Sequence, residues 1–105
     1  MSLAITSLFR TEILNSTSVI SVWAPVTSPY LDHYIIYYYP DFAHSNRKKR
    51  QINEQKAVFP AGSASGVIGG LEEGQHYLFS LAVVFNINCN GDIFETERTK
   101  PTPMG

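Results

Sequence analysis

The chain has 105 residues, of which 44% are hydrophobic and 16% are charged, and its formal net charge is −1. This length suits one domain with a single core, and the composition excludes a disordered chain. A charge so close to zero gives no general attraction to nucleic acid or to a membrane surface. The longest apolar run, residues 77–85, is far shorter than the ~20 residues of a membrane-spanning helix. We therefore expect no nucleic-acid partner and no membrane insertion by this segment.

Short runs of aromatic and β-branched residues alternate with turn sequences along the chain, and no run has the periodicity of a helix. Pro25 closes one such run, and Asn90-Gly91 suits a tight hairpin turn. This pattern predicts an all-β, seven-stranded antiparallel β-sandwich. The expected strands are residues 5–14, 19–23, 33–39, 55–59, 65–68, 77–86 and 93–99.

A single domain is expected over residues 1–105, with residues 4 to about 100 ordered. Residues 101–105 are expected to be a linker, because Pro101-Thr102-Pro103 has the composition of one. The first residues lack the basic and apolar regions of a signal peptide, so a secreted parent protein would carry its signal elsewhere. Cys89 is the single cysteine, which excludes an internal disulfide bond and leaves the cellular compartment open.

Leu71, Gly74 and Tyr77 are spaced three residues apart just before the longest apolar run. Leu-x-x-Gly-x-x-Tyr in this position resembles the tyrosine corner of the fibronectin type III family. The resemblance implies that Leu71 plugs the core and that Gly74 permits the turn between the sheets. It also implies that the Tyr77 hydroxyl bonds back to the backbone. The role of all three residues would be structural.

Further landmarks of this family fall in the family's order along nearly the whole chain. They are Trp23-Ala24-Pro25, Tyr34-x-Ile36-x-Tyr38 and Thr99-Lys100-Pro101. The resemblance implies an immunoglobulin-like sandwich in which strands A, B and E pack on strands C′, C, F and G. The expected core residues are Trp23, Tyr34, Ile36, Leu71, Tyr77, Phe79 and Leu81.

Two features depart from the family pattern. Ser21 occupies an inward position that is usually aliphatic. Strand B therefore either carries a bulge or has an apolar outer face formed by Ile20 and Val22. The segment between strands C and C′, residues 40–54, is longer and more polar than usual. It is either a candidate site or a disordered insert.

Four adjacent basic residues in that segment fit the Arg-x-(Lys/Arg)-Arg pattern cut by furin-like proprotein convertases. They are Arg47, Lys48, Lys49 and Arg50. The same charges could bind a sulfated glycosaminoglycan, or act as a nuclear import signal in an intracellular protein. They could also form no more than a solvated, flexible loop. The sequence leaves these interpretations open.

Two more motifs lie in expected turns. Asn15-Ser16-Thr17 is an N-glycosylation acceptor sequence, which favours a secreted protein. Asn90-Gly91-Asp92 lies where some members of the family display Arg-Gly-Asp to integrins. The arginine is absent here, so we assign the motif to turn geometry. Cys89 is expected to be a free thiol, with pairing to another chain or domain as the alternative.

The outward faces of strands C and F are expected to be unusually apolar, because the residues between the inward positions are themselves hydrophobic. Such a face indicates an interface with a protein partner, a neighbouring domain or a second copy in a weak homodimer. Alternatively, a long loop covers it, or the register differs by one residue. The residues are Ile35, Tyr37, Tyr39, Leu78, Ala82 and Val84.

No catalytic, cofactor-binding or metal site is expected, because His33, His44 and His76 are scattered and no phosphate-binding loop is present. The leading interpretation is a non-catalytic extracellular module, for protein binding and spacing, of a multidomain cell-surface receptor, adhesion or matrix protein. The parent protein would be membrane-anchored or secreted. One alternative is an intracellular module of a cytoskeletal or chromatin-associated protein. Another is an accessory domain of an enzyme such as a receptor phosphatase or a bacterial glycosidase.

Overall fold

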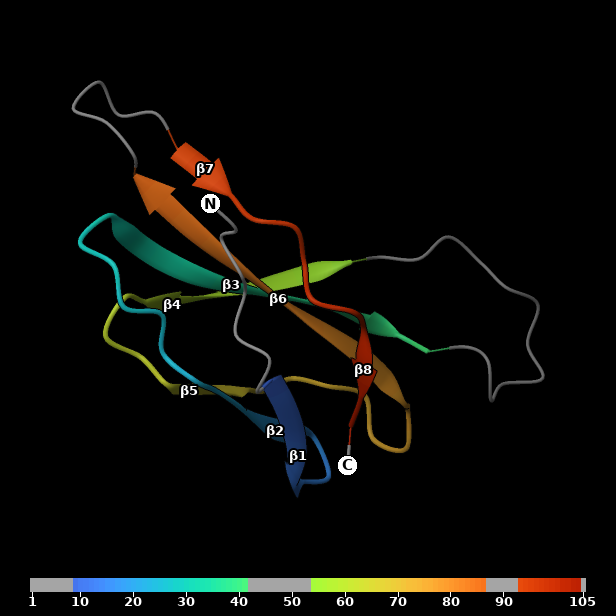
Figure 1. The fold of residues 1–105 in the computed structure, drawn as a ribbon. Helices are drawn as coiled ribbons and strands as arrows, with labels where there is room; N and C mark the ends of the chain where they lie inside the picture. Colours follow the sequence, from blue (N-terminus) through green and yellow to red (C-terminus); the bar gives the residue numbers. More distant parts are fainter. Residues whose placement is uncertain (1–8, 42–53, 87–92, 105) are drawn as a thin grey trace.

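Eight short strands form two antiparallel sheets in the computed structural model, which describes residues 9–41, 54–86 and 93–104. One sheet has the order β1-β2-β5, and the other has the order β4-β3-β6-β7 with β8 also paired to β6. Figure 1 shows the sheets as two layers, which confirms the expected packing of strands A, B and E on C′, C, F and G. The strands are β1 (Phe9–Asn15), β2 (Ser18–Trp23), β3 (Leu31–Pro40), β4 (Gln55–Pro60), β5 (Ser65–Ile68), β6 (Tyr77–Asn86), β7 (Ile93–Glu95) and β8 (Thr102–Pro103).

Most strands lie where the alternation of side chains predicts them. β5 and β6 begin and end at the predicted residues, and β3 is longer at both ends. The last part of the chain differs from the prediction. The strand expected at residues 93–99 continues only to Glu95. The segment expected to be a linker contributes β8 instead, in which Thr102 and Pro103 pair with Phe79 and Leu78.

An extra residue interrupts the ladder between β7 and β8. The N–H of Thr96 donates to the carbonyl of Val83, and the N–H of Thr99 donates to the carbonyl of Leu81. The chain after β7 thus advances three residues while β6 advances two, which is the pattern of a β-bulge. The hydroxyls of the two threonines accept hydrogen bonds of 3.0 and 2.9 Å from the N–H groups of the same residues of β6. The threonine side chains therefore hold this edge to β6 where the regular pairing stops.

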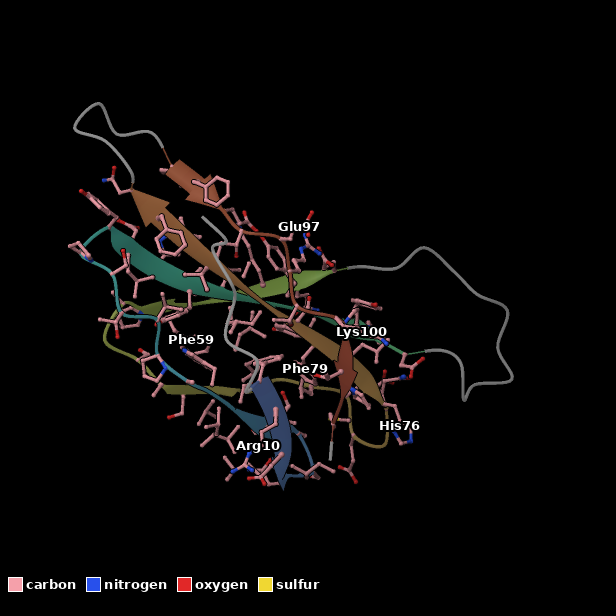
Figure 2. The ribbon with its side chains drawn as sticks, in the orientation of Figure 1. Arg10, Phe59, His76, Phe79, Glu97 and Lys100 are labelled. Carbon is pink, nitrogen blue, oxygen red and sulfur yellow. The ribbon has the colours of Figure 1, made fainter. Side chains whose placement is uncertain are left out.

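The core lies between the sheets (Figure 2), and all seven side chains predicted for it are buried. The ring of Trp23 lies 5.3 Å from that of Tyr34 and 5.7 Å from that of Phe59, measured between centroids. Tyr34 is fully buried, and its hydroxyl accepts a 2.9 Å hydrogen bond from the N–H of Val26. Only glycine fits at Gly66, because a Cβ there would lie 2.3 Å from the Phe59 ring.

Ser21 points into this core, which decides between the two explanations for its unusual position. The pairing of β2 with β5 is uninterrupted, so there is no bulge at Ser21. Ile20 and Val22 are half-buried on the outer face, which is therefore apolar. The Ser21 hydroxyl forms a 2.8 Å hydrogen bond with that of Thr11, and both side chains are buried.

We expect Ser21→Ala to lower the free energy of unfolding by about 1–3 kcal/mol, because it leaves the Thr11 hydroxyl buried without its partner. The double variant Thr11→Val/Ser21→Ala removes both hydroxyls and should recover most of that loss. Urea unfolding of the two variants measures the difference. A double variant that is no more stable than Ser21→Ala would contradict this account of the pair.

Candidate functional site

The outer face of the β4-β3-β6-β7 sheet is more enclosed than the sequence predicts. Ile35, Ala82 and Val84 were expected to be exposed, but their exposed fractions are 7%, 0% and 2%. The remaining residues of the predicted patch are half-buried; they are Tyr37, Tyr39 and Leu78. Half of the members are therefore buried within the domain, so the face is not one exposed apolar patch, and its use as an interface stays a prediction.

Long polar side chains cross this face from one edge of the sheet to the other. The Tyr37 hydroxyl on β3 donates a 2.5 Å hydrogen bond to Glu95 Oε1 on β7, so the Tyr37 side chain spans the intervening strand β6. The Arg98 guanidinium lies 3.5 Å from the centroid of the Tyr37 ring and forms a 2.5 Å ion pair with Glu54, next to β4. These four residues are termed the Tyr37 cluster. A layer of paired polar groups thus takes the place of the expected apolar patch.

Two features of the chain put the Tyr37 cluster in place. The extra residue between Thr96 and Thr99 brings Arg98 over the outer face, where strict alternation would have turned it inward. On β6, the residue paired with Tyr37 is Ser80, and the next residue on the same face towards Glu95 is Ala82. Both side chains are small, which leaves room for Tyr37 to cross the strand. Side-chain alternation alone therefore does not predict that Arg98 lies on the outer face. The sequence signal that could have predicted it is the three-residue spacing of Thr96 and Thr99 in an edge strand.

Charge and burial shift the titration of the Tyr37 cluster. Partial burial raises the pKa of the Tyr37 phenol, and the hydrogen bond and negative charge of Glu95 raise it further, while Arg98 acts in the opposite direction. Partial burial lowers the pKa of Arg98, but the hydrogen bond and charge of Glu54 outweigh this, so the net shift is upward. At neutral pH the phenol therefore keeps its proton and the guanidinium its charge.

Tyrosine and arginine are among the side chains most enriched at the energetic centres of protein interfaces. In the Tyr37 cluster, the carboxylates of Glu95 and Glu54 hold the ring and the guanidinium in place, so little conformational freedom is left to lose on binding. The Arg98 side chain is nevertheless 42% exposed. This arrangement is suited to contact with a protein surface.

The described residues contain no group of His, Cys, Asp and Glu side chains that could hold a metal ion.

The tyrosine corner has the geometry that the family resemblance implies. The Tyr77 hydroxyl accepts a 2.8 Å hydrogen bond from the N–H of Glu72. Gly74 has a φ of 78°, a conformation in which a side chain would be strained. Leu71 is buried, and its N–H donates to the carbonyl of Thr17 at 2.9 Å, which ties the corner to the β1–β2 turn. These contacts are structural.

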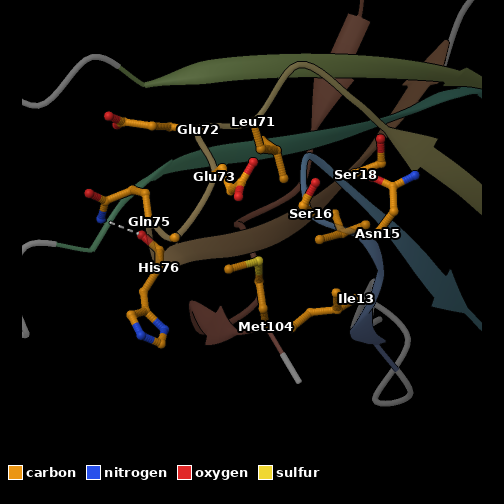
Figure 3. A pocket seen from close by; sticks show the side chains of 12 residues that line it. Ile13, Asn15, Ser16, Ser18, Leu71, Glu72, Glu73, Gln75, His76 and Met104 are labelled. Carbon is orange, nitrogen blue, oxygen red and sulfur yellow. Dashed lines mark hydrogen bonds between the residues drawn. The ribbon is translucent and has the colours of Figure 1, made fainter.

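A hollow of about 290 Å³ lies between the corner and the β1–β2 turn. Ile13 and Met104 form part of its apolar wall. Figure 3 shows Gln75 and His76 on one side of the hollow and Asn15 on the other. The hollow thus brings together the β1–β2 turn, the corner and the end of β8, which are far apart in the sequence.

Some residues singled out in the sequence fall outside the part of the chain that the structure describes. These are Arg47, Lys48, Lys49, Arg50, His44, Cys89 and Asn90-Gly91-Asp92. Asn15 is exposed at the end of β1, and His33 is half-buried and pairs with Asp32 at 2.5 Å. In residues 9–41, 54–86 and 93–104 there is no helix with the length and hydropathy of a membrane span.

Solved structures of other proteins share this two-sheet fold. The third fibronectin III domain of the human KIAA0343 protein has a TM-score of 0.74 with this chain at 27% identity, and the match covers 93% of this chain and 77% of that one. The chain is a fibronectin type III domain. The FN1–FN3 domains of chicken CNTN1 share its fold with a TM-score of 0.70 at 16% identity, over 93% of this chain and 30% of that one. No protein-family model matches the sequence.

Relatives of this fibronectin type III domain include neural adhesion proteins. It is 31% identical to neuronal cell adhesion molecule of Mus musculus over 101 residues, which are 91% of the chain. It is 30% identical to neural cell adhesion molecule L1 of Homo sapiens over an alignment 106 residues long, which covers 97% of the chain. The domain spans 8% of the length of each of these relatives, so the similarity concerns one part of a much longer protein.

Tyr77→Phe is expected to lower the free energy of unfolding by about 1–3 kcal/mol, because the Glu72 N–H loses its acceptor at a partly buried position. Tyr30→Phe is the matched control. Tyr30 is 55% exposed, and its change should cost less than about half a kcal/mol. Urea or thermal unfolding compares the two variants. Equal losses of unfolding free energy in the two variants would show that the hydrogen bond of the Tyr77 hydroxyl does not stabilise the corner.

The pKa of Tyr37 is expected to move in opposite directions in two variants. Glu95→Gln removes a negative charge and should lower the pKa, whereas Arg98→Ala removes a positive charge and should raise it. Alkaline titration followed by the ultraviolet absorbance of phenolate measures both shifts, with Tyr37→Phe as the blank that identifies the signal. Shifts of the same sign would contradict the arrangement of the Tyr37 cluster.

The raised pKa of Tyr37 also sets how this side chain affects stability at high pH. The unfolded chain releases the phenol proton near the ordinary pKa of 10.0, while the folded chain holds it to a higher pH. The stabilisation is therefore complete below pH 10.0 and is lost as the pH rises through the folded-state pKa. Tyr37→Phe should remove this part of the alkaline loss of stability.

Proposed function

We propose that this fibronectin type III domain is a non-catalytic, extracellular protein-binding module of a cell-surface adhesion protein. The observation that carries the proposal is the alignment of the chain with two neural adhesion proteins. The alignments cover 91% and 97% of the chain, at 31% and 30% identity. The exposed N-glycosylation acceptor at Asn15 supports an extracellular location. The two packed sheets supply a rigid frame that presents a binding face and keeps the neighbouring parts of the longer protein apart.

The Tyr37 cluster is the surface that we assign to partner binding. It combines an arginine stacked on a tyrosine with two carboxylates, and Lys56 lies beside Tyr37 on the neighbouring strand. A surface with both signs of charge favours a protein partner over a sulfated polysaccharide, because Glu54 and Glu95 would repel sulfate groups. The partner should therefore be a protein surface with its own mixture of charges and apolar side chains.

Beads coated with the domain are expected to adhere to cultured neuronal cells. Arg98→Ala should weaken that adhesion by about tenfold or more, as truncation of an interface hot spot does. Arg98 is exposed and stacks on Tyr37 outside the core, so the variant should keep the fold. Flow cytometry counts bound beads, and thermal unfolding checks that the variant is folded.

Arg10→Ala is the matched control, because Arg10 is also an exposed arginine but lies on β1 in the other sheet. Beads with this variant should bind as well as the wild type. Equal adhesion by all three kinds of bead would exclude the Tyr37 cluster as the binding surface. Failure of the wild-type beads to adhere would contradict the proposed function, and clumping of the beads with one another would identify a second copy of the domain as the partner.

A further inference from the structure

The β1–β2 turn carries a chemical motif that the proposed binding face does not use. Asn15, Ser16 and Thr17 are all exposed; Asn15 is the last residue of β1, and Ser16 and Thr17 form the turn before β2. Asn-x-Ser/Thr without proline in the middle is the acceptor sequence for N-linked glycosylation. An oligosaccharide is bulky and hydrated, so it is compatible with a folded domain only at a surface position such as this turn.

The Asn15 side chain is oriented by the motif itself. Its Oδ1 accepts a 3.0 Å hydrogen bond from the Thr17 N–H and a 3.4 Å hydrogen bond from Thr17 Oγ1. This is an Asx turn, in which the carboxamide oxygen anchors the side chain to the backbone two residues on. Both bonds use the oxygen. The amide nitrogen, which is the atom that accepts a sugar, belongs to the end of the side chain that these bonds leave available.

The surface around Asn15 is apolar for the end of an exposed strand. Ile13 and Leu14 are 63% and 53% exposed. Ile13, Met104 and Asn15 are all among the residues that line the hollow (Figure 3). Sugar rings have C–H faces that pack on apolar side chains while their hydroxyl groups stay in water. A glycan here would therefore cover apolar surface that is otherwise exposed to solvent.

We propose that Asn15 carries an N-linked oligosaccharide whose first sugars lie over Ile13 and the hollow. In the transfer, Asn15 Nδ2 forms a bond to C1 of the first sugar as the C1–O bond to a lipid diphosphate donor breaks. The lipid diphosphate leaves with the electron pair, and Nδ2 loses one proton. The inference rests on the proposed function, because this transfer occurs on chains that enter the secretory pathway.

The test uses the domain expressed in cultured mammalian cells, with an added secretion signal and a C-terminal tag that contains a second acceptor sequence. The mass of the protein, before and after treatment with an enzyme that removes N-linked glycans, reports the occupancy of each site. We expect the wild type to be occupied at Asn15 and in the tag. Asn15→Gln and Thr17→Ala should lose only the glycan at Asn15. Thr17→Ser is the matched control, which keeps the acceptor sequence and should keep the glycan.

An occupied tag beside an unmodified Asn15 would overturn the inference and leave the adhesion proposal standing. That proposal is tested through Arg98, on the outer face of the other sheet. Conversely, glycosylated beads that fail to adhere to cells would contradict the proposed function without changing the result at Asn15. The placement of the sugars is tested by NMR cross-relaxation between sugar protons and the Ile13 methyl protons, which we expect to observe. Its absence in the glycosylated domain would overturn that placement.

Discussion

The packing of Trp23 between the sheets is the contact on which the rest of the domain depends. Trp23 comes from one sheet, and the rings of Tyr34 and Phe59 that it meets come from the other. The indole N–H has no hydrogen-bond partner within the described residues, and among them the ring is held by packing. This contact sets the spacing of the sheets, and Gly66 lets Phe59 approach closely enough to share in it. With the spacing set, one face of β3 and β6 lies in the core and the other lies under the Tyr37 cluster.

The fold and the core could be predicted from the sequence because side-chain alternation and the corner motif are local properties. Leu71 and Tyr77 are buried as their motif implies. The candidate binding face could be predicted only in part. Whether an outward residue such as Ala82 is exposed depends on side chains that arrive from other strands. Arg98 is brought there by an extra residue, whose position is set by hydrogen bonds across the sheet rather than by local propensity.

The two sheets take different parts in the proposed function. The outer face of the β4-β3-β6-β7 sheet carries the Tyr37 cluster, while the turn with the glycosylation acceptor belongs to the other sheet. The ion pair of Arg98 with Glu54 is partly exposed, and pairs of this kind contribute little to stability. Its residues can therefore vary with the partner while the core remains unchanged. In the proposed function, recognition and folding are therefore carried by separate sets of side chains.

The pairing of β8 has a mechanical consequence for a domain with the proposed role in adhesion. Tension applied at Met104 reaches β6 first through β8, whose ladder contains only the pairs of Thr102 and Pro103. Proline has no N–H to donate, so this ladder is weak and should part before the bonds of Thr99 come under load. The chain then lengthens by a few residues while the sheets stay closed around the core. We therefore expect the C-terminal end of the domain to act as an extensible link, which yields to small forces and re-forms when they are released.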